Sequence, residues 1–172
     1  MVSDHPLLPM SIFNYVEQKF NQPDLAYLAL RVVFGGTIIL FGVSKLLAGG
    51  EMYAQIGGSM AMFGITWEPK FWGLLCALTE TFGGFLVLIG VFCRTAAFLL
   101  VGNMFVASIV LYKMMGAPDM SSIGAVSEWL GKAALPEFYL AAFLALLFTG
   151  PGKYTVVIKS GGGGGRSKAA KE

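Results

Sequence analysis

Residues 71–92 read FWGLLCALTETFGGFLVLIGVF, an apolar run of membrane-spanning length that carries a single acidic residue, Glu80, near its middle. Upstream, residues 25–47 read LAYLALRVVFGGTIILFGVSKLL, and two further apolar runs follow at about 95–115 and 133–150. A helix of roughly 20 apolar residues crosses a bilayer core of about 30 Å. None of the runs alternates apolar with polar residues, as barrel strands do. We therefore expect an all-α membrane protein, a four-transmembrane-helix bundle.

Composition supports this fold class. Of the 172 residues, 56% are hydrophobic and 13% are charged, against roughly 25% charged residues in ordinary soluble domains. The net charge of +2 comes without a basic stripe, which argues against a nucleic-acid partner. The composition therefore excludes an ordinary soluble enzyme and makes the lipid bilayer the first expected partner.

Two flanking segments frame the expected transmembrane domain, 25–150. Residues 1–24 form an N-terminal surface segment, in which SIFNYVEQKF (11–20) has the periodicity of an interfacial amphipathic helix. Packing of this helix on a soluble partner is the alternative. Residues 151–172 contain a short extended segment and a Gly-rich basic tail. Inside the domain, an amphipathic stretch at 122–134 leads into the short fourth span through a kink at Pro136.

Basic residues outside the spans predict the orientation of the bundle. One side carries seven of them: Lys19, Arg94, Lys153, Lys159, Arg166, Lys168 and Lys171. The other side carries Lys70 and Lys132, with Lys45 and Lys113 at helix ends. The excess predicts that both termini are cytoplasmic. We expect the multi-pass protein to lie in a bacterial-type inner (plasma) membrane.

Ionisable residues inside a membrane are costly and call for an explanation. Glu80 lies near mid-depth on a face of small residues, and such faces mark close helix contacts. Estimated depths place Arg31 and Asn103 nearest to Glu80, so we expect a polar cluster of Arg31, Glu80 and Asn103, with Lys45 as the second candidate partner. The cluster either fixes helix packing or serves a ligand, quinone or proton. Lys45 and Arg94 lie at the ends of spans, where we expect their side chains to snorkel toward the membrane surface. They are also candidate quinone or lipid contacts.

Residues that hold redox cofactors are scarce in this sequence. His5, the only histidine, lies outside the spans, and the two cysteines, Cys76 and Cys93, are far apart on one expected helix. A bis-histidine haem or an iron–sulfur cluster would need more ligands than these. We therefore expect no catalytic residues, no metal site and no cofactor bound by this chain alone, with quinone as the one candidate ligand.

Several motifs resemble the DoxX family of small four-helix membrane proteins. The matching runs are LRVVFGGTIILFGVSKL, TETFGGFLVLIGVFCRTAA and GPGKYTV. Glu80, Gly83, Gly84, Gly90, Arg94 and Thr95 carry the most specific pattern, and Arg31 and Lys45 also match. Thr155 and Val157 stand where the terminal pattern usually has Ser and Asp. The resemblance implies a role in membrane redox systems, including a quinone-reducing thiosulfate oxidation complex, and action together with other membrane-complex subunits.

Three functions remain open on this basis. The first is a non-catalytic accessory or scaffold subunit of a membrane redox or respiratory complex. The second is the quinone-site subunit of a thiosulfate:quinone-type oxidoreductase, with Arg31, Glu80 and Lys45 lining a cleft. The third is a small transporter, against which stands the lack of paired broken helices or a chain of acidic residues.

Overall fold

The computed structural model describes residues 22–156, and all regular structure within them is helical. Its first span consists of α2 (Pro23–Leu30), the π-helical turn η1 (Arg31–Gly35) and α3 (Gly36–Ala48). The second consists of α5 (Pro69–Leu78), the π-helical turn η3 (Thr79–Gly83) and α6 (Gly84–Ile89). The third and fourth spans are α7 (Cys93–Met115) and α8 (Ile123–Thr149). Between the first two lie α4 (Gly50–Gly58) and the 3₁₀ turn η2 (Ser59–Phe63).

Four helices of the described chain are long and apolar enough to cross a membrane, which confirms the predicted all-α bundle. The first three agree closely with the expected spans. The fourth begins at Ile123, well before the expected residue 133, because Ser122 caps it by accepting a hydrogen bond from the Ala125 N–H (3.2 Å). The stretch at 122–134 is thus part of α8, and Pro136 lies inside the continuous helix. The predicted helix at 11–20 and the tail from 157 onward lie outside the described residues.

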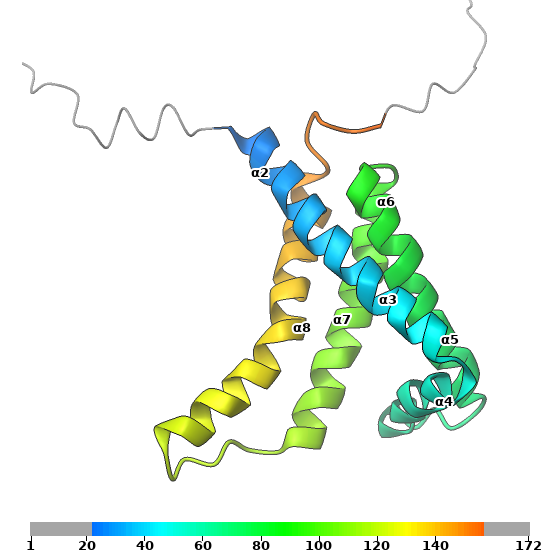
Figure 1. The fold of residues 1–172 in the computed structure, drawn as a ribbon, viewed down its shortest axis with the longest axis vertical. Helices are drawn as coiled ribbons and strands as arrows, with labels where there is room; N and C mark the ends of the chain where they lie inside the picture. Colours follow the sequence, from blue (N-terminus) through cyan, green and yellow to red (C-terminus); the bar gives the residue numbers. More distant parts are fainter. Residues whose placement is uncertain (1–21, 157–172) are drawn as a thin grey trace, which may run out of the picture.

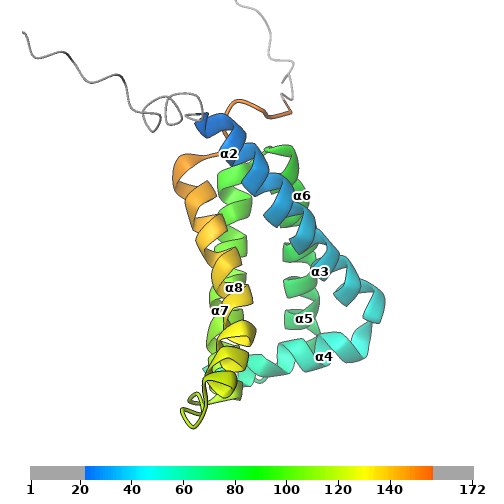
Figure 2. The same cartoon turned by 60° about the vertical axis from the view of Figure 1, so that its left-hand side comes forward.

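The spans converge at one end of the molecule and spread apart at the other. The start of α2, the end of α6, the start of α7 and the end of α8 gather at the top of Figure 1. Below them, the first and second spans diverge from the pair formed by α7 and α8, and Figure 2 shows α4 lying across the wide end.

Glycines allow the first and second spans to cross at close range. A Cβ atom at Gly42 would stand 2.6 Å from the Thr81 backbone nitrogen, and one at Gly84 would stand 3.0 Å from the Gly35 carbonyl oxygen. Small residues are what membrane helices use to approach backbone to backbone. The crossing brings Lys45 and Glu80 together, because Gly42 lies one turn before Lys45 and Thr81 directly follows Glu80.

A second close contact holds α4 against α5. A Cβ atom at Gly57 would overlap the Pro69 carbonyl and stand 2.8 Å from the Gly73 nitrogen. The Tyr53 hydroxyl donates a hydrogen bond to the Leu46 carbonyl oxygen (2.9 Å), which ties α4 back to α3. At its far end, η2 accepts a hydrogen bond at the Met62 carbonyl from Lys113 of α7 (3.3 Å). The segment α4–η2 therefore bridges the second and third spans.

The two π-helical turns occupy equivalent places in one sequence pattern. Residues 34–43 and 82–91 both read F-G-G, five residues, then G-V. The turns η1 and η3 end at the first glycine of each pattern, and they contain Arg31 and Glu80 respectively. π-Helical turns insert an extra residue and recur at functional sites. Arg31 and Glu80, the two buried charged residues of these spans, thus each lie in such a local widening of the helix.

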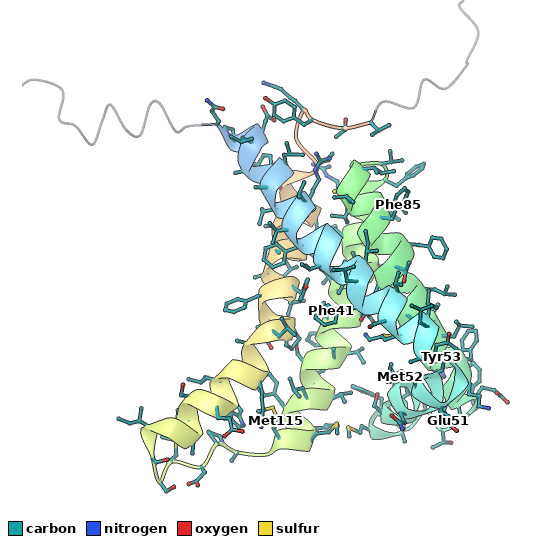
Figure 3. The ribbon with its side chains drawn as sticks, in the orientation of Figure 1. Phe41, Glu51, Met52, Tyr53, Phe85 and Met115 are labelled. Atoms are coloured by element: carbon teal, nitrogen blue, oxygen red, sulfur yellow. The ribbon has the colours of Figure 1, made fainter. Side chains whose placement is uncertain are left out.

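Apolar side chains cover the outside of the bundle. Phe85 is 51% exposed and points away from α6 in Figure 3. Other large apolar residues along the spans are even more exposed, including Leu40, Phe98 and Phe148. So much exposed apolar surface suits contact with lipid rather than water. The buried core lies mainly between α7, α8 and α6, around Leu100, Phe143 and Leu146.

Candidate functional site

Glu80 is the central residue of the candidate site. It projects from η3, is 2% exposed, and bonds to partners from two other spans. Lys45 of α3 donates from Nζ to both carboxylate oxygens, at 2.5 Å to Oε1 and 2.6 Å to Oε2. Asn103 of α7 donates from Nδ2 to Oε1 at 3.0 Å. A buried carboxylate needs this kind of counter-ion and hydrogen bonding to remain in a poorly solvated place.

The structure brings together only part of the predicted cluster. Asn103 contacts Glu80, but the predicted pairing of Arg31 with Glu80 is wrong, and Lys45 takes that place. Lys45 lies in the last turn of α3, on the face that crosses the second span, and its side chain is still 25% exposed. Its flexible four-carbon stem lets the ammonium group reach inward while the backbone stays near the boundary.

Arg31 is buried elsewhere, at the end of the bundle where the spans converge. It is 1% exposed and donates from Nη2 to the Tyr154 carbonyl oxygen. The segment after α8 crosses this end and is also tied by Lys153 to Asp24, with backbone N to Oδ1 at 3.0 Å. Arg31 therefore anchors the C-terminal segment 151–156 over the helix ends, a contact between residues far apart in the sequence.

Arg94, another candidate contact, lies at the same end of the bundle. Its side chain is exposed and reaches the last turn of α8, with Nη2 at 3.5 Å from the Phe148 carbonyl oxygen. A cation at a helix C-terminus satisfies free carbonyls and the helix dipole. The structure thus places Arg94 and Arg31 apart from Glu80, so they do not line one cleft with it.

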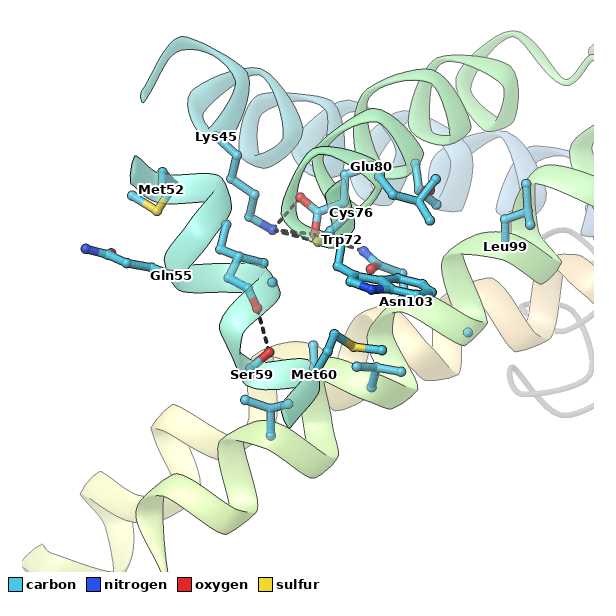
Figure 4. A pocket seen from close by; sticks show the side chains of 18 of the residues that line it. Lys45, Met52, Gln55, Ser59, Met60, Trp72, Cys76, Glu80, Leu99 and Asn103 are labelled. Carbon is cyan, nitrogen blue, oxygen red and sulfur yellow. Dashed lines mark hydrogen bonds and ion pairs between the residues drawn. The ribbon is translucent and has the colours of Figure 1, made fainter. Parts of the chain in front are cut away.

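A cavity of about 610 Å³ opens beside the ion pair. One wall comes from α4 and η2, with Met52, Gln55, Ser59 and Met60, and the facing wall comes from α7, with Gly102, Asn103 and Val106. Figure 4 shows Lys45, Cys76 and Glu80 at its inner side, between these walls. Its volume lies within the range of about 300–1,000 Å³ that is usual for small-molecule sites, and it combines apolar walls with a few convergent polar groups.

Two further features belong to this region. Cys76 lies one helical turn before Glu80, with Sγ at 3.7 Å from Oε1 and 3.8 Å from Lys45 Nζ. A second, smaller cavity of about 260 Å³ lies between α3, α7 and α8 and is also lined by Lys45 and Glu80. The ion pair therefore separates two spaces. Cys76 and Cys93 are both free thiols.

Sequence reasoning missed the wall made by α4 and η2. The available signal is a pair of glycines, Gly57 and Gly73, which pack α4 against α5, and Gly57 itself lines the cavity. Trp72 also lines the cavity. Among residues 22–156, no group of His, Cys, Asp or Glu side chains is arranged to hold a metal ion.

These features define a four-helix integral membrane protein with a buried ion pair beside an internal cavity. The family model described as DoxX matches residues 26–113, which include Arg31, Lys45, Glu80 and Asn103. The chain belongs to the DoxX family. The comparisons with curated proteins and with solved structures found no match.

Proposed function

We propose that this chain is the quinone-site subunit of a membrane oxidoreductase, located in a bacterial-type inner membrane. The observation that carries the proposal is the cavity of about 610 Å³ with the Lys45–Glu80–Asn103 cluster on its inner side. In a subunit that served purely as a scaffold, an open space beside the buried ion pair would not stabilise the fold, since empty volume removes packing contacts.

A lipid-soluble ligand with a polar head fits this cavity. Met60, Val106 and Leu99 provide apolar wall, while the ion pair and Asn103 offer polar contacts for oxygen atoms. Quinones have this chemistry and diffuse within the bilayer. The electrons would come from a partner subunit that carries the redox cofactor, which agrees with the membrane redox systems that the DoxX resemblance implies.

The test compares two glycine variants of the full chain. Gly102 lines the cavity, and a Cβ atom there would meet nothing within 4 Å, so Gly102→Leu should fill the space without disturbing the protein. Gly131 of α8 is equally open but lies outside the cavity, which makes Gly131→Leu the matched control. Each protein is purified from native membranes in mild detergent, and quinone is extracted and quantified per mole of protein.

We expect quinone with the wild type and with Gly131→Leu, and only background amounts with Gly102→Leu. Equal thermal unfolding of the three proteins would show that the loss is local. No quinone in the wild type, or equal amounts in all three, would overturn the proposal and leave the accessory or scaffold role as the better description.

A further inference from the structure

We propose that Arg31 and Arg94 bind a phosphate group at the end of the bundle where the spans converge, and that the segment 151–156 covers this site until the anion displaces it. The headgroup of an acidic phospholipid is the source of the phosphate that this position favours. The site lies apart from the cavity beside Glu80, so the inference does not depend on the proposed function. It starts from the buried charge of Arg31.

Arg31 is a buried cation that has no counter-ion among the described residues. It is 1% exposed, and its Nη2 donates to a neutral acceptor, the Tyr154 carbonyl oxygen. Its other two guanidinium nitrogens, Nε and Nη1, are fully covered and have no hydrogen-bond partner within residues 22–156. A guanidinium keeps its charge when it is buried, so this arrangement is costly. An anion at Arg31 would remove the cost, which indicates a ligand.

The position of the Arg31 guanidinium suggests which anion is available to it. A Cβ atom at Gly90 would overlap Arg31 Nη1, so the guanidinium lies directly against Gly90. Gly90 caps the end of α6, in the short turn that leads to the start of α7 at Cys93. A turn between two spans lies at the membrane boundary, where the phosphates of lipid headgroups are the abundant anions. Acidic lipids are also attracted by the excess of basic residues on this side of the bundle.

Arg94 provides a second guanidinium at the same end of the bundle. It is exposed and reaches the last turn of α8, after which the segment 151–156 begins. The segment therefore runs from Arg94 to Arg31. Asp24 also lies at this end, but its carboxylate already pairs with Lys153 at 3.2 Å. Neither arginine forms an ion pair with a carboxylate in the part of the chain that the structure describes, so both attract an anion.

The segment 151–156 covers the buried guanidinium with few contacts of its own. It crosses over the converged helix ends without forming a helix (Figure 1). Lys153 donates from its backbone N to Asp24 Oδ1 (3.0 Å), and the Val156 N–H donates to the Ile89 carbonyl oxygen (3.1 Å). Lys153 and Val156 are themselves more than half exposed. A segment that buries so little of its own surface costs little to displace.

Exchange of this segment for a phosphate would improve the hydrogen bonding of Arg31. The segment offers one neutral carbonyl oxygen, whereas a phosphate offers several charged acceptors, and hydrogen bonds to charged groups are roughly twice as strong as neutral ones. Nε and Nη1 would also gain partners. The phosphate and the segment therefore compete for one guanidinium, so holding the segment in place should weaken phosphate binding.

The first experiment locks the segment reversibly and measures lipid binding. Asp24→Cys and Lys153→Cys are introduced together, because these side chains already pair and their joint replacement leaves the net charge unchanged. Native mass spectrometry of the full chain in detergent measures bound phosphatidylglycerol, with phosphatidylcholine as the lipid without net charge. We expect the reduced protein to bind phosphatidylglycerol about tenfold more tightly than the disulfide form, the effect of one charge-assisted hydrogen bond. The wild type under the same two conditions controls for Cys76 and Cys93, and its affinity should not change.

The second experiment compares two exposed cations and does not depend on the disulfide. Arg94→Gln removes a proposed ligand of the phosphate, and we expect it to lower the affinity for phosphatidylglycerol about tenfold. Lys132→Gln is the matched control, because Lys132 is also exposed but lies near the start of α8, at the opposite end of the bundle. Separate samples contain inorganic phosphate and no acidic lipid, and phosphorus NMR measures its binding to the same proteins.

The outcomes identify the source of the phosphate or overturn the site. Phosphatidylglycerol binding that is weakened by the disulfide and by Arg94→Gln, and unchanged in Lys132→Gln, supports the inference with a phospholipid as the source. The same pattern with inorganic phosphate alone keeps the site and makes a free anion its source. Equal binding by the disulfide and reduced forms, or equal losses in Arg94→Gln and Lys132→Gln, for both probes, overturns the inference. None of these results bears on the quinone-site proposal, which has its own cavity and its own test.

Discussion

At the scale of single residues, Glu80 shows how a carboxylate is kept in the interior of a membrane bundle. Its two oxygens accept three strong hydrogen bonds, two from Lys45 and one from Asn103. Removing one member of a buried ion pair leaves the other charge without compensation, which destabilises more than the pair itself stabilises. The same residues face the cavity, so stability and ligand binding depend on one cluster.

A double-mutant cycle on Lys45 and Glu80 tests this pairing. We expect Glu80→Gln and Lys45→Met each to lower the free energy of unfolding by about 3 kcal/mol, because each strands the opposite charge. The double variant should recover at least about 1 kcal/mol relative to the sum of the two losses. The measurement is denaturant unfolding of the purified protein in mild detergent micelles.

The control cycle pairs Glu80→Gln with Arg31→Gln. Arg31 bonds to the Tyr154 carbonyl and not to Glu80, so their effects should add within about 0.5 kcal/mol. Strong coupling between Arg31 and Glu80, or none between Lys45 and Glu80, would contradict the geometry of the site.

Sequence reasoning identified Glu80 and Asn103 but chose the wrong cation for a physical reason. Depth along an ideal helix locates backbone atoms, and it put Arg31 closer to Glu80 than Lys45. The cation that pairs with Glu80 depends on three features that helix depth does not describe. These are the close crossing at Gly42, the reach of the lysine side chain, and the return of the segment 151–156 over Arg31. That return joins residues 123 positions apart, and no local pattern indicates it.

At the scale of elements, the apolar runs were enough to predict the four spans, since a bilayer imposes both length and composition. The expected start at residue 133 is later than the observed start of α8, because the helix begins at the cap formed by Ser122 and continues through Pro136. The helix α4 was missed because its residues are less apolar than those of a span. Its position depends on tertiary contacts of glycines with α5.

Neighbouring glycines of α4 allow a direct test of this docking. Gly57→Ala should lower the free energy of unfolding by about 1–3 kcal/mol, as overpacking does, because its Cβ would overlap Pro69. Gly58 has open space, so Gly58→Ala should be neutral or stabilise by about 0.5 kcal/mol through helix propensity. Thermal unfolding in detergent distinguishes the two, and equal effects would mean that α4 is not packed against α5 as described.

At the scale of the whole molecule, four spans place the start of α2 and the end of α8 at the same end of the bundle (Figure 1). Both termini are predicted to be cytoplasmic from the distribution of Lys and Arg. Single cysteines at Ser3 and Ser167 should therefore react with a membrane-impermeant maleimide from one side of sealed vesicles. A cysteine at Ser121, between α7 and α8, should react from the other side. Labelling of Ser3 and Ser167 positions from opposite sides would contradict the four-span arrangement.

The central claim is that the space between α4–η2 and α7 is a ligand site. Photolabelling with an azido-quinone in native membranes, followed by peptide mass spectrometry, tests it most directly. We predict labelled residues on both walls, within 52–60 and 99–114, and loss of this labelling when unmodified quinone is added in excess. Labelling confined to lipid-facing positions such as Phe85 and Leu40, and unaffected by competitor, would contradict the claim.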